Sequence, residues 1–109
     1  MRRAAIYIER QFAGQLTEDE QGYHFEYDEG YRLQPGARPV SLTLPLRAQP
    51  YRSSVLFPFF DGLIPEGWLL DIAQKNWKLN PRDRMGLLLT CCKDCIGTVS
   101  VVEIKEEAA

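Results

Sequence analysis

Histidine and cysteine, residues that often hold metal ions or act as nucleophiles, are scarce in this sequence of 109 residues. It has one histidine and three cysteines. No apolar stretch is long enough to cross a membrane as a helix, which requires about 20 residues. The apolar segment Ala4–Ile8, which follows Arg2 and Arg3, is too short for the core of a signal peptide. We therefore expect a cytoplasmic protein that does not contact membranes.

Positive charge is also sparse. The formal net charge is −2, and there is no basic run beyond Arg2 and Arg3. The sequence therefore lacks the electrostatic footprint of a protein that binds nucleic acid directly. Hydrophobic residues make up 45% and charged residues 26%, as in ordinary globular proteins. We expect a single domain over residues 1–109, with its core in residues 4–104 and a charged C-terminal tail.

The three cysteines lie close together at Cys91, Cys92 and Cys95. Their odd number does not suggest a disulfide framework. Cys92 and Cys95 have the spacing of redox motifs and of half zinc sites, but a zinc site needs about four ligands. His24 is far away in sequence, and a thioredoxin-type site would need a βαβ context. We interpret Cys92 and Cys95 as partly buried thiols at a helix end, with redox or metal chemistry as the alternative.

Other catalytic signals are missing. His24 lies on the polar face of an expected strand, and the sequence near it offers no serine or cysteine nucleophile. Neither a glycine-rich phosphate loop nor the catalytic loop of a kinase is present. We interpret the acidic residues around the third expected strand as solvated, with paired carboxylates as the alternative; they are Glu18, Asp19, Glu20, Asp28 and Glu29. We expect a protein that is not an enzyme and holds no cofactor or metal.

Alternating apolar residues predict an antiparallel meander of strands at Ala4–Glu9, Phe12–Thr17 and Tyr23–Tyr27, with Gly14 as a possible bulge. Thr98–Ile104, which is rich in β-branched residues, predicts a last strand that returns to this sheet. The segment Val40–Leu46 also alternates, but Pro45 limits it to a short edge strand or an extended segment. Segments 28–39 and 47–54 are expected to be irregular.

Helices are expected in the second half of the chain. Phe57–Phe60 predicts one helical turn with Pro58 at its start, and Pro65–Trp77 predicts a longer helix. A second long helix is expected after Asn80, with Asn80 as its cap and Asp83 in its first turn. Its buried face would consist of Met85, Leu88, Leu89 and Cys92. The fold class is thus α+β, a small antiparallel sheet with two main helices packed on it.

The stretch from Phe59 to Trp68 is the most distinctive part of the sequence. Asp61, Gly62 and Pro65 interrupt its apolar residues, so the chain must turn before the helix begins. Trp68 lies in the first turn of that helix, away from the face formed by Leu69 and Ile72. Such a tryptophan either fills the core or serves as an exposed anchor for a partner, since tryptophan often dominates the energy of interfaces.

Five segments of the sequence form an ordered set. They are Gly14-Gln15-Leu16, Phe25-Glu26-Tyr27, Ser41-Leu42-Thr43-Leu44-Pro45-Leu46, Phe59–Gly67 and Asp94-Cys95-Ile96-Gly97-Thr98-Val99. In this order they resemble the N-terminal subdomain of HipA-type serine/threonine kinases, the toxins of bacterial toxin–antitoxin modules. The similarity extends from Ala4 to Ile104, and its most specific parts are Leu42–Leu46 and Phe60–Gly67.

The resemblance implies a function through binding. HipA-type toxins continue into a kinase domain, whereas this sequence ends after the last expected strand, as in the small HipS-like antitoxin of split HipBST-type modules. That resemblance implies two partners: a HipT/HipA-type kinase toxin, and a HipB-like helix-turn-helix repressor, reached directly or through the kinase.

We expect the Gly62–Trp68 turn to enter the kinase active site, with Trp68 as the inserted residue. The residues expected to support it are Leu63, Ile64, Pro65, Glu66 and Gly67. One alternative is a structural subunit that completes the kinase and bridges it to the repressor without inhibition. Another is an unrelated thiol enzyme that uses Cys92 and Cys95.

Overall fold

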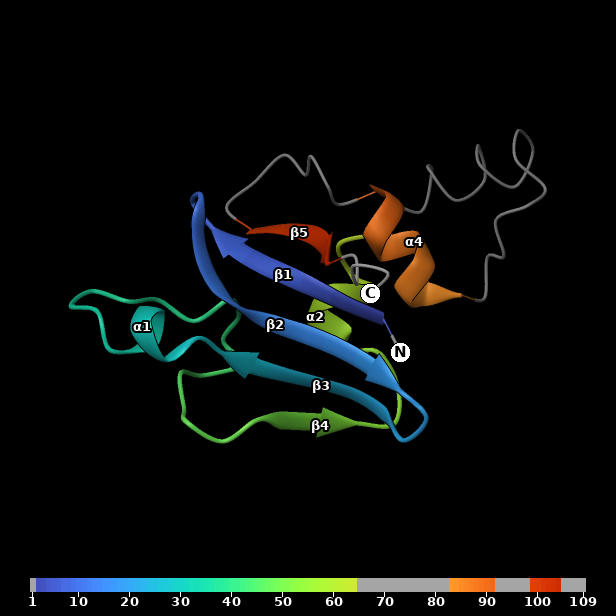
Figure 1. Ribbon diagram of the computed structural model, residues 1–109, viewed down its shortest axis with the longest axis horizontal. Coiled ribbons are helices and arrows are strands. Elements are labelled where there is room, and N and C mark those ends of the chain that lie inside the picture. The colour runs from blue at the N-terminus through green and yellow to red at the C-terminus, as the bar shows by residue number, and fades with distance from the viewer. Residues whose placement is uncertain (1, 65–82, 92–98, 105–109) are drawn as a thin grey trace, which may run out of the picture.

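The computed structural model describes residues 2–64, 83–91 and 99–104. Its elements form an α+β fold, as expected from the sequence (Figure 1). In chain order they are β1 (Arg2–Ile8), β2 (Gln11–Asp19), β3 (Gly22–Tyr27), α1 (Glu29–Arg32), β4 (Tyr51–Ser53), α2 (Pro58–Asp61), α4 (Arg84–Cys91) and β5 (Val99–Ile104).

The strands form a five-stranded sheet in the order β4-β3-β2-β1-β5, and all neighbours are antiparallel. The predicted meander β1-β2-β3 is confirmed, and the last strand returns beside β1, where Val101 lies opposite Ile6. Strand β4 was not predicted. It forms because the short segment Tyr51–Ser53 finds a partner in β3, with Arg52 opposite His24.

Two tight hairpins connect the meander. Glu9 and Arg10 join β1 to β2 and have positive φ angles of 48° and 72°, as in the type I′ turns that suit the twist of paired strands. The turn thus comes one residue earlier than the expected connection at Arg10-Gln11. The second hairpin turns between Asp19 and Gly22, where the Asp19 carboxylate accepts a hydrogen bond from the Gln21 amide at 2.8 Å.

A bulge interrupts the pairing of β1 with β2. Ile6 lies opposite Gly14 while Tyr7 lies opposite Phe12, so Ala13 is the extra residue on β2. The sequence placed this irregularity at the neighbouring Gly14. The carbonyl of Ala13 accepts a hydrogen bond from the Asp28 amide at 2.8 Å, so the bulge holds the chain where it leaves β3.

One face of the sheet carries the hydrophobic core. Helix α2 lies behind the sheet in Figure 1, and Phe60 from this helix packs edge-on against Phe25 of β3, with ring centroids 5.4 Å apart. The largest side chains with almost no exposed surface are Phe25, Phe60, Ile6, Leu16, Met85, Leu87, Leu88 and Val101. Burial of Met85 and Leu88 in α4 was expected, whereas Leu87 replaces Leu89, which is only partly buried.

Two tyrosines hold the segment between α1 and β4. The Tyr31 hydroxyl donates to the carbonyl of Arg38 at 2.7 Å and accepts from its amide at 3.2 Å. The Tyr27 hydroxyl accepts from the amide of Val40 at 2.9 Å and donates to the carbonyl of Leu44. These bonds replace regular secondary structure, so a segment with little pairing of its own still has a defined path.

The expectation of a short edge strand or an extended segment at Val40–Leu46 is wrong for Ser41–Leu44. Only an isolated bridge between Ser41 and Leu44 occurs there, and the chain makes a tight turn instead. The irregular segment 28–39 also contains α1, where the Asp28 carboxylate accepts from the Tyr31 amide at 3.0 Å. In the Val40–Leu46 segment, the Tyr27 hydroxyl bonds to the Val40 amide and to the Leu44 carbonyl, and so joins the two ends of the turn.

The start of α4 differs from the expectation as well. The Asp83 carboxylate accepts from the Gly86 amide at 3.2 Å and its carbonyl accepts from Leu87 at 3.0 Å, so Asp83 is the N-cap. The sequence placed Asp83 inside the first turn and the cap at Asn80. Asn80 and the predicted helix Pro65–Trp77 lie outside the described residues.

Candidate functional site

The candidate site begins with the helical turn α2, which the sequence predicted from Pro58. Pro58 occupies the start of the helix, where its missing amide hydrogen has no cost. Phe60 is fully buried, and its ring contacts Phe57 and Phe59 edge-on at centroid distances of 6.3 and 5.2 Å. These aromatic contacts fix α2 on the core face of the sheet, where Phe57 and Phe60 are buried.

The chain continues from α2 into the turn that the sequence singled out. The Leu63 amide donates to the Phe60 carbonyl at 3.1 Å, and the Ile64 amide donates to the Asp61 carbonyl at 3.2 Å. Ile64 is 4% exposed and belongs to the core, and Leu63 packs partly buried against it. The first half of the Gly62–Trp68 turn is therefore held by both backbone bonds and apolar packing.

Helix α4 supports this turn through an ion pair. The Arg84 guanidinium contacts the Asp61 carboxylate at 2.5 Å, joining the start of α4 to the end of α2. Both side chains are about a third exposed, so the pair orients the two helices more than it stabilises them. It links the beginning of the candidate turn to α4.

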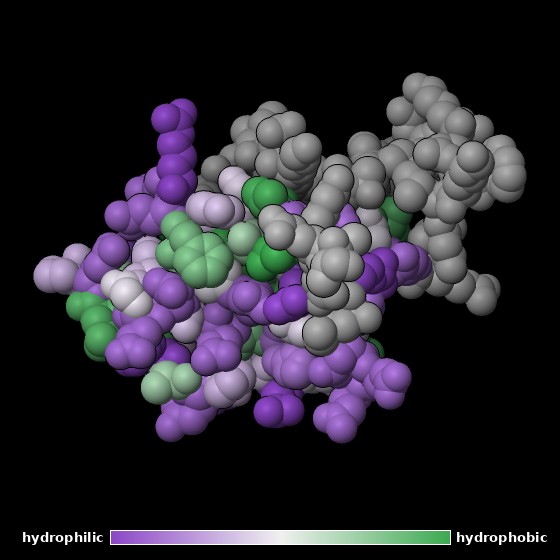
Figure 2. All heavy atoms as spheres, in the orientation of Figure 1, coloured by the Kyte–Doolittle hydropathy of each residue, from purple (hydrophilic) through white to green (hydrophobic). Residues whose placement is uncertain are grey.

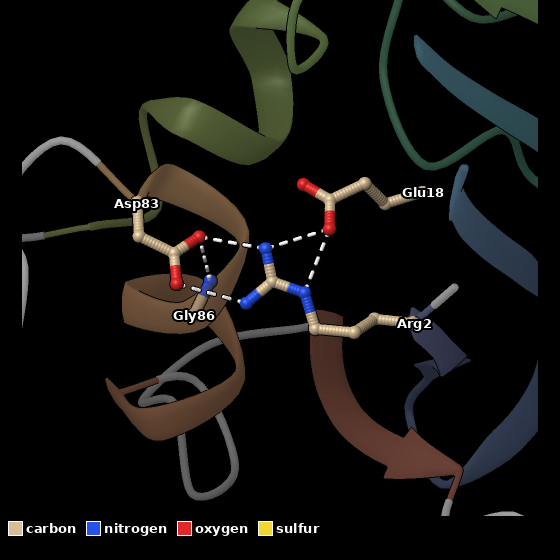
Figure 3. Close-up of polar contacts among 4 residues, drawn as sticks. All are labelled: Arg2, Glu18, Asp83 and Gly86. Atoms are coloured by element: carbon tan, nitrogen blue, oxygen red, sulfur yellow. Dashed lines mark hydrogen bonds and ion pairs between the residues drawn. The ribbon is translucent and has the colours of Figure 1, made fainter. Parts of the chain in front are cut away.

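A second ion cluster joins α4 to the sheet. Figure 3 shows the Arg2 guanidinium between two carboxylates, with Asp83 on one side and Glu18 on the other. The two bonds to Asp83 measure 2.9 and 2.7 Å, and the bond to Glu18 measures 2.7 Å. The hydrogen bonds from Arg2 lower the pKa of Asp83, and the Asp83 carboxylate in turn raises the pKa of Arg2.

The opposite face of the sheet is open and polar over β2, β3 and β4. In Figure 2, which shows this face, hydrophilic residues cover most of the surface, and hydrophobic ones gather near the β1–β2 hairpin and β5. His24 contacts the Asp19 carboxylate at 2.7 Å here. An open hollow on this face is lined by Arg3, Phe12, Gly14, Gln15, Thr17, Asp19, His24, Glu26, Tyr27, Asp28, Glu29, Pro50 and Arg52.

The acidic residues near β3 have separate roles. Glu18 contacts Arg2, Asp19 contacts His24, and Asp28 caps α1. These three carboxylates therefore contact three different groups, and the alternative of paired carboxylates stays a prediction. Within the ranges 2–64, 83–91 and 99–104, no group of three or more histidine, cysteine and acidic residues could hold a metal ion.

The remaining predicted site residues are placed as follows. Of the six residues assigned to kinase binding, the structure describes Leu63 and Ile64, whereas Pro65, Glu66, Gly67 and Trp68 lie outside the described residues. Cys91 is the last residue of α4, and Cys92 and Cys95 lie outside the described residues. The predictions for Trp68 and for the C-x-x-C pair therefore remain predictions.

Sequence reasoning missed one exposed apolar residue. Leu42 is 95% exposed at the tip of the Ser41–Leu44 turn, although the alternating pattern placed it on the same face as Val40 and Leu44. The signal available was Pro45, which disfavours a regular strand.

In the described part of the chain, no helix is long and apolar enough to span a lipid bilayer.

Comparison with solved structures identifies the class of domain. The fold matches a structure described as the N-terminal domain of HipA toxin, with a TM-score of 0.78 and 30% sequence identity. The match covers 98% of this chain and 96% of the other. A sequence model of the family described as HipA N-terminal domain also matches residues 4–102. The chain therefore belongs to the HipA N-terminal domain family, as its sequence segments suggested.

Two relatives show the settings in which similar sequences occur. An uncharacterised protein of Haemophilus influenzae is 32% identical over 106 residues, which are 97% of this chain and 96% of the relative. The putative kinase Y4mE of Sinorhizobium fredii is 27% identical over 103 residues, 94% of this chain but only 24% of the relative. The similar sequence thus makes up nearly all of one relative and about a quarter of the other.

Proposed function

We propose that this protein is an antitoxin that binds a HipT/HipA-type serine/threonine kinase toxin and inhibits it. Family membership over residues 4–102 supports a role in HipA-associated toxin–antitoxin systems. The putative kinase of S. fredii carries a similar segment, which makes up 24% of its chain. A domain that packs against a kinase within one chain retains a complementary surface when it is made separately.

The protein would act by contact instead of by catalysis. Among the described residues, the single histidine contacts Asp19, and the carboxylates of Glu18 and Asp83 are occupied by Arg2. These charged groups are engaged within the fold, and we infer that the protein acts by binding. A HipB-like helix-turn-helix repressor would be the further partner, bound directly or through the kinase.

The observation that carries this proposal is how firmly the start of the Gly62–Trp68 turn is held. Burial of Ile64, the packing of Leu63 and the Arg84–Asp61 ion pair restrict the turn before the chain reaches Trp68. A support that is already ordered up to Ile64 loses less conformational entropy on binding, which raises affinity. We assign Trp68 as the residue that enters the kinase active site, supported by Leu63, Ile64, Pro65, Glu66 and Gly67.

The test is autophosphorylation of a HipT-like kinase, measured with and without this chain. Wild-type chain should suppress phosphorylation, and Trp68→Ala should abolish that suppression while its circular dichroism spectrum stays folded. Trp77→Ala, at the only other tryptophan of the sequence, is the matched control and should inhibit like the wild type.

Two results would contradict the proposal in different ways. Tight binding that leaves kinase activity unchanged or raised would make the protein a structural subunit, bridging kinase and repressor. Full inhibition by a folded Trp68→Ala variant would leave an antitoxin whose inhibitory element is elsewhere.

A further inference from the structure

The turn at Ser41–Leu44 presents a single apolar side chain to solvent. The Leu44 amide donates to the Ser41 carbonyl at 3.1 Å, and the Thr43 amide donates to the Ser41 hydroxyl at 3.2 Å. The hydroxyls of Ser41 and Thr43 also lie 3.0 Å apart. Leu42 occupies the tip between them and is 95% exposed.

Both ends of this turn are fixed in the core. Val40 is 7% exposed and Leu44 is 4% exposed. The Tyr27 hydroxyl bonds to the amide of Val40 and the carbonyl of Leu44, so one buried group clamps the two ends together. The position of Leu42 is therefore set by β3, a central part of the sheet, and not by the surface loop alone.

Leu42 stands apart from the other apolar residues on the described surface. The other large hydrophobic residues with high exposure are Leu33 and Val55, at 64% each, and Phe12, at 40%. The fold uses the neighbouring Val40 and Leu44 in the core but leaves Leu42 outside it. Packing among the residues that the structure describes therefore does not account for Leu42.

We propose that Leu42 is a second docking anchor, which inserts into an apolar pocket on the kinase partner away from the site that receives Trp68. The partner's identity rests on the proposed function. A rigid turn with one large apolar side chain fits a pocket for a single aliphatic group, because the anchor is already ordered before binding. Burial of the leucine would then contribute affinity without contributing to inhibition itself.

The kinase is the favoured occupant because one relative carries the similar segment together with a longer remainder in a single chain. In the putative kinase of S. fredii, the similar segment is accompanied by about three quarters of the chain, which could cover such a turn. A second copy of this protein is the competing occupant. It would require Leu42 to fit a pocket on this domain, and the described hollow on the open face is lined mostly by polar residues.

The experiment measures, by calorimetry, the dissociation constant of the complex between this chain and a HipT-like kinase. Leu42→Ala should weaken binding roughly ten-fold or more, as expected for loss of a buried anchor. Leu42→Met, which keeps the volume and apolar character, should bind within about three-fold of the wild type. Leu33→Ala, at the exposed leucine outside the turn, is the matched control and should change nothing.

The outcomes separate this inference from the proposed function. Unchanged binding by Leu42→Ala, with a wild-type chain that binds and inhibits, overturns the anchor and leaves the antitoxin intact. A wild-type chain that does not bind the kinase overturns both. Dimerisation of the free chain that Leu42→Ala abolishes, measured by analytical ultracentrifugation, would assign the turn to self-association and also overturn the inference. Weaker binding by Leu42→Ala, with full inhibition at saturation, supports it.

Discussion

Arg2 in β1 and Asp83 at the N-terminus of α4 form a two-pronged ion pair across 81 positions of sequence, with nitrogen–oxygen distances of 2.9 and 2.7 Å. The same guanidinium contacts Glu18 of β2 at 2.7 Å (Figure 3). This arrangement connects α4 to the neighbouring strands β1 and β2. It gives the sheet a polar connection to α4 beside the apolar one formed by Met85 and Leu88.

Removal of this connection should lower stability. Arg2→Ala should reduce the free energy of unfolding by about 1–2 kcal/mol, because two carboxylates lose a partly buried partner. Chemical denaturation provides the measurement. The control is Arg38→Ala, whose ion pair with Glu9 is mostly exposed, and its effect should be clearly smaller than that of Arg2→Ala. Equal effects of the two variants would contradict a special role for Arg2.

The pKa of Asp83 predicts a pH dependence in acid. Hydrogen bonds from Arg2 hold this pKa below its ordinary value of 3.8 in the folded protein. The unfolded chain therefore binds the proton more readily, so stability rises with pH between the two pKa values. The contribution of Asp83 is complete above about pH 4 and is lost as the pH falls through the folded-state pKa.

The matched variant for this pH dependence is Asp83→Asn, because asparagine is also a good N-cap and keeps the start of α4. The free energy of unfolding of Asp83→Asn should vary less with pH below about pH 4 than that of the wild type. Parallel curves for the two proteins between about pH 2 and pH 5 would show that Asp83 does not titrate as described.

The hydroxyl of Tyr27 provides a test of the clamp on the Val40–Leu44 segment. Tyr27→Phe keeps the buried ring but leaves the Val40 amide without its acceptor, which should cost about 1–3 kcal/mol of unfolding free energy. Tyr51→Phe is the control, because its hydroxyl bonds to the Pro45 carbonyl in an exposed setting and its loss should cost less.

Burial also raises the pKa of Tyr27 to about 12. Its phenol should therefore ionise after exposed tyrosines in an ultraviolet titration.

Gly14 is required where β2 passes closest to β3. A methyl group there would meet the carbonyl oxygen of Glu26 and come within 3.1 Å of the Tyr27 Cα, and backbone atoms cannot move aside cheaply. Gly14→Ala should therefore cost about 1–3 kcal/mol of unfolding free energy, measured by chemical denaturation. Gly30→Ala is the control, since its methyl would approach only the Asp28 side chain, and a near-neutral effect is expected. A stable Gly14→Ala protein would refute this packing.

Much of the fold could be predicted from local sequence patterns. The alternation of Tyr23, Phe25 and Tyr27 predicted β3, and Pro58 predicted the start of α2. Hydrophobic periodicity depends on neighbouring residues only, so these elements needed no knowledge of the partner strands. The candidate site was predicted in part: the structure confirms the helical turn before Gly62 and buries Ile64, while Trp68 lies outside the described residues.

Other elements depend on contacts between distant residues. The sequence by itself determined the meander, the returning strand and the family resemblance, because each is carried by contiguous residues. Only the tertiary structure decided that Tyr51–Ser53 pairs with β3 and that Leu42 turns outward. The physical reason is that the hydroxyl of Tyr27 and the backbone of β3 supply partners for these segments, and no local pattern shows which distant group will supply them.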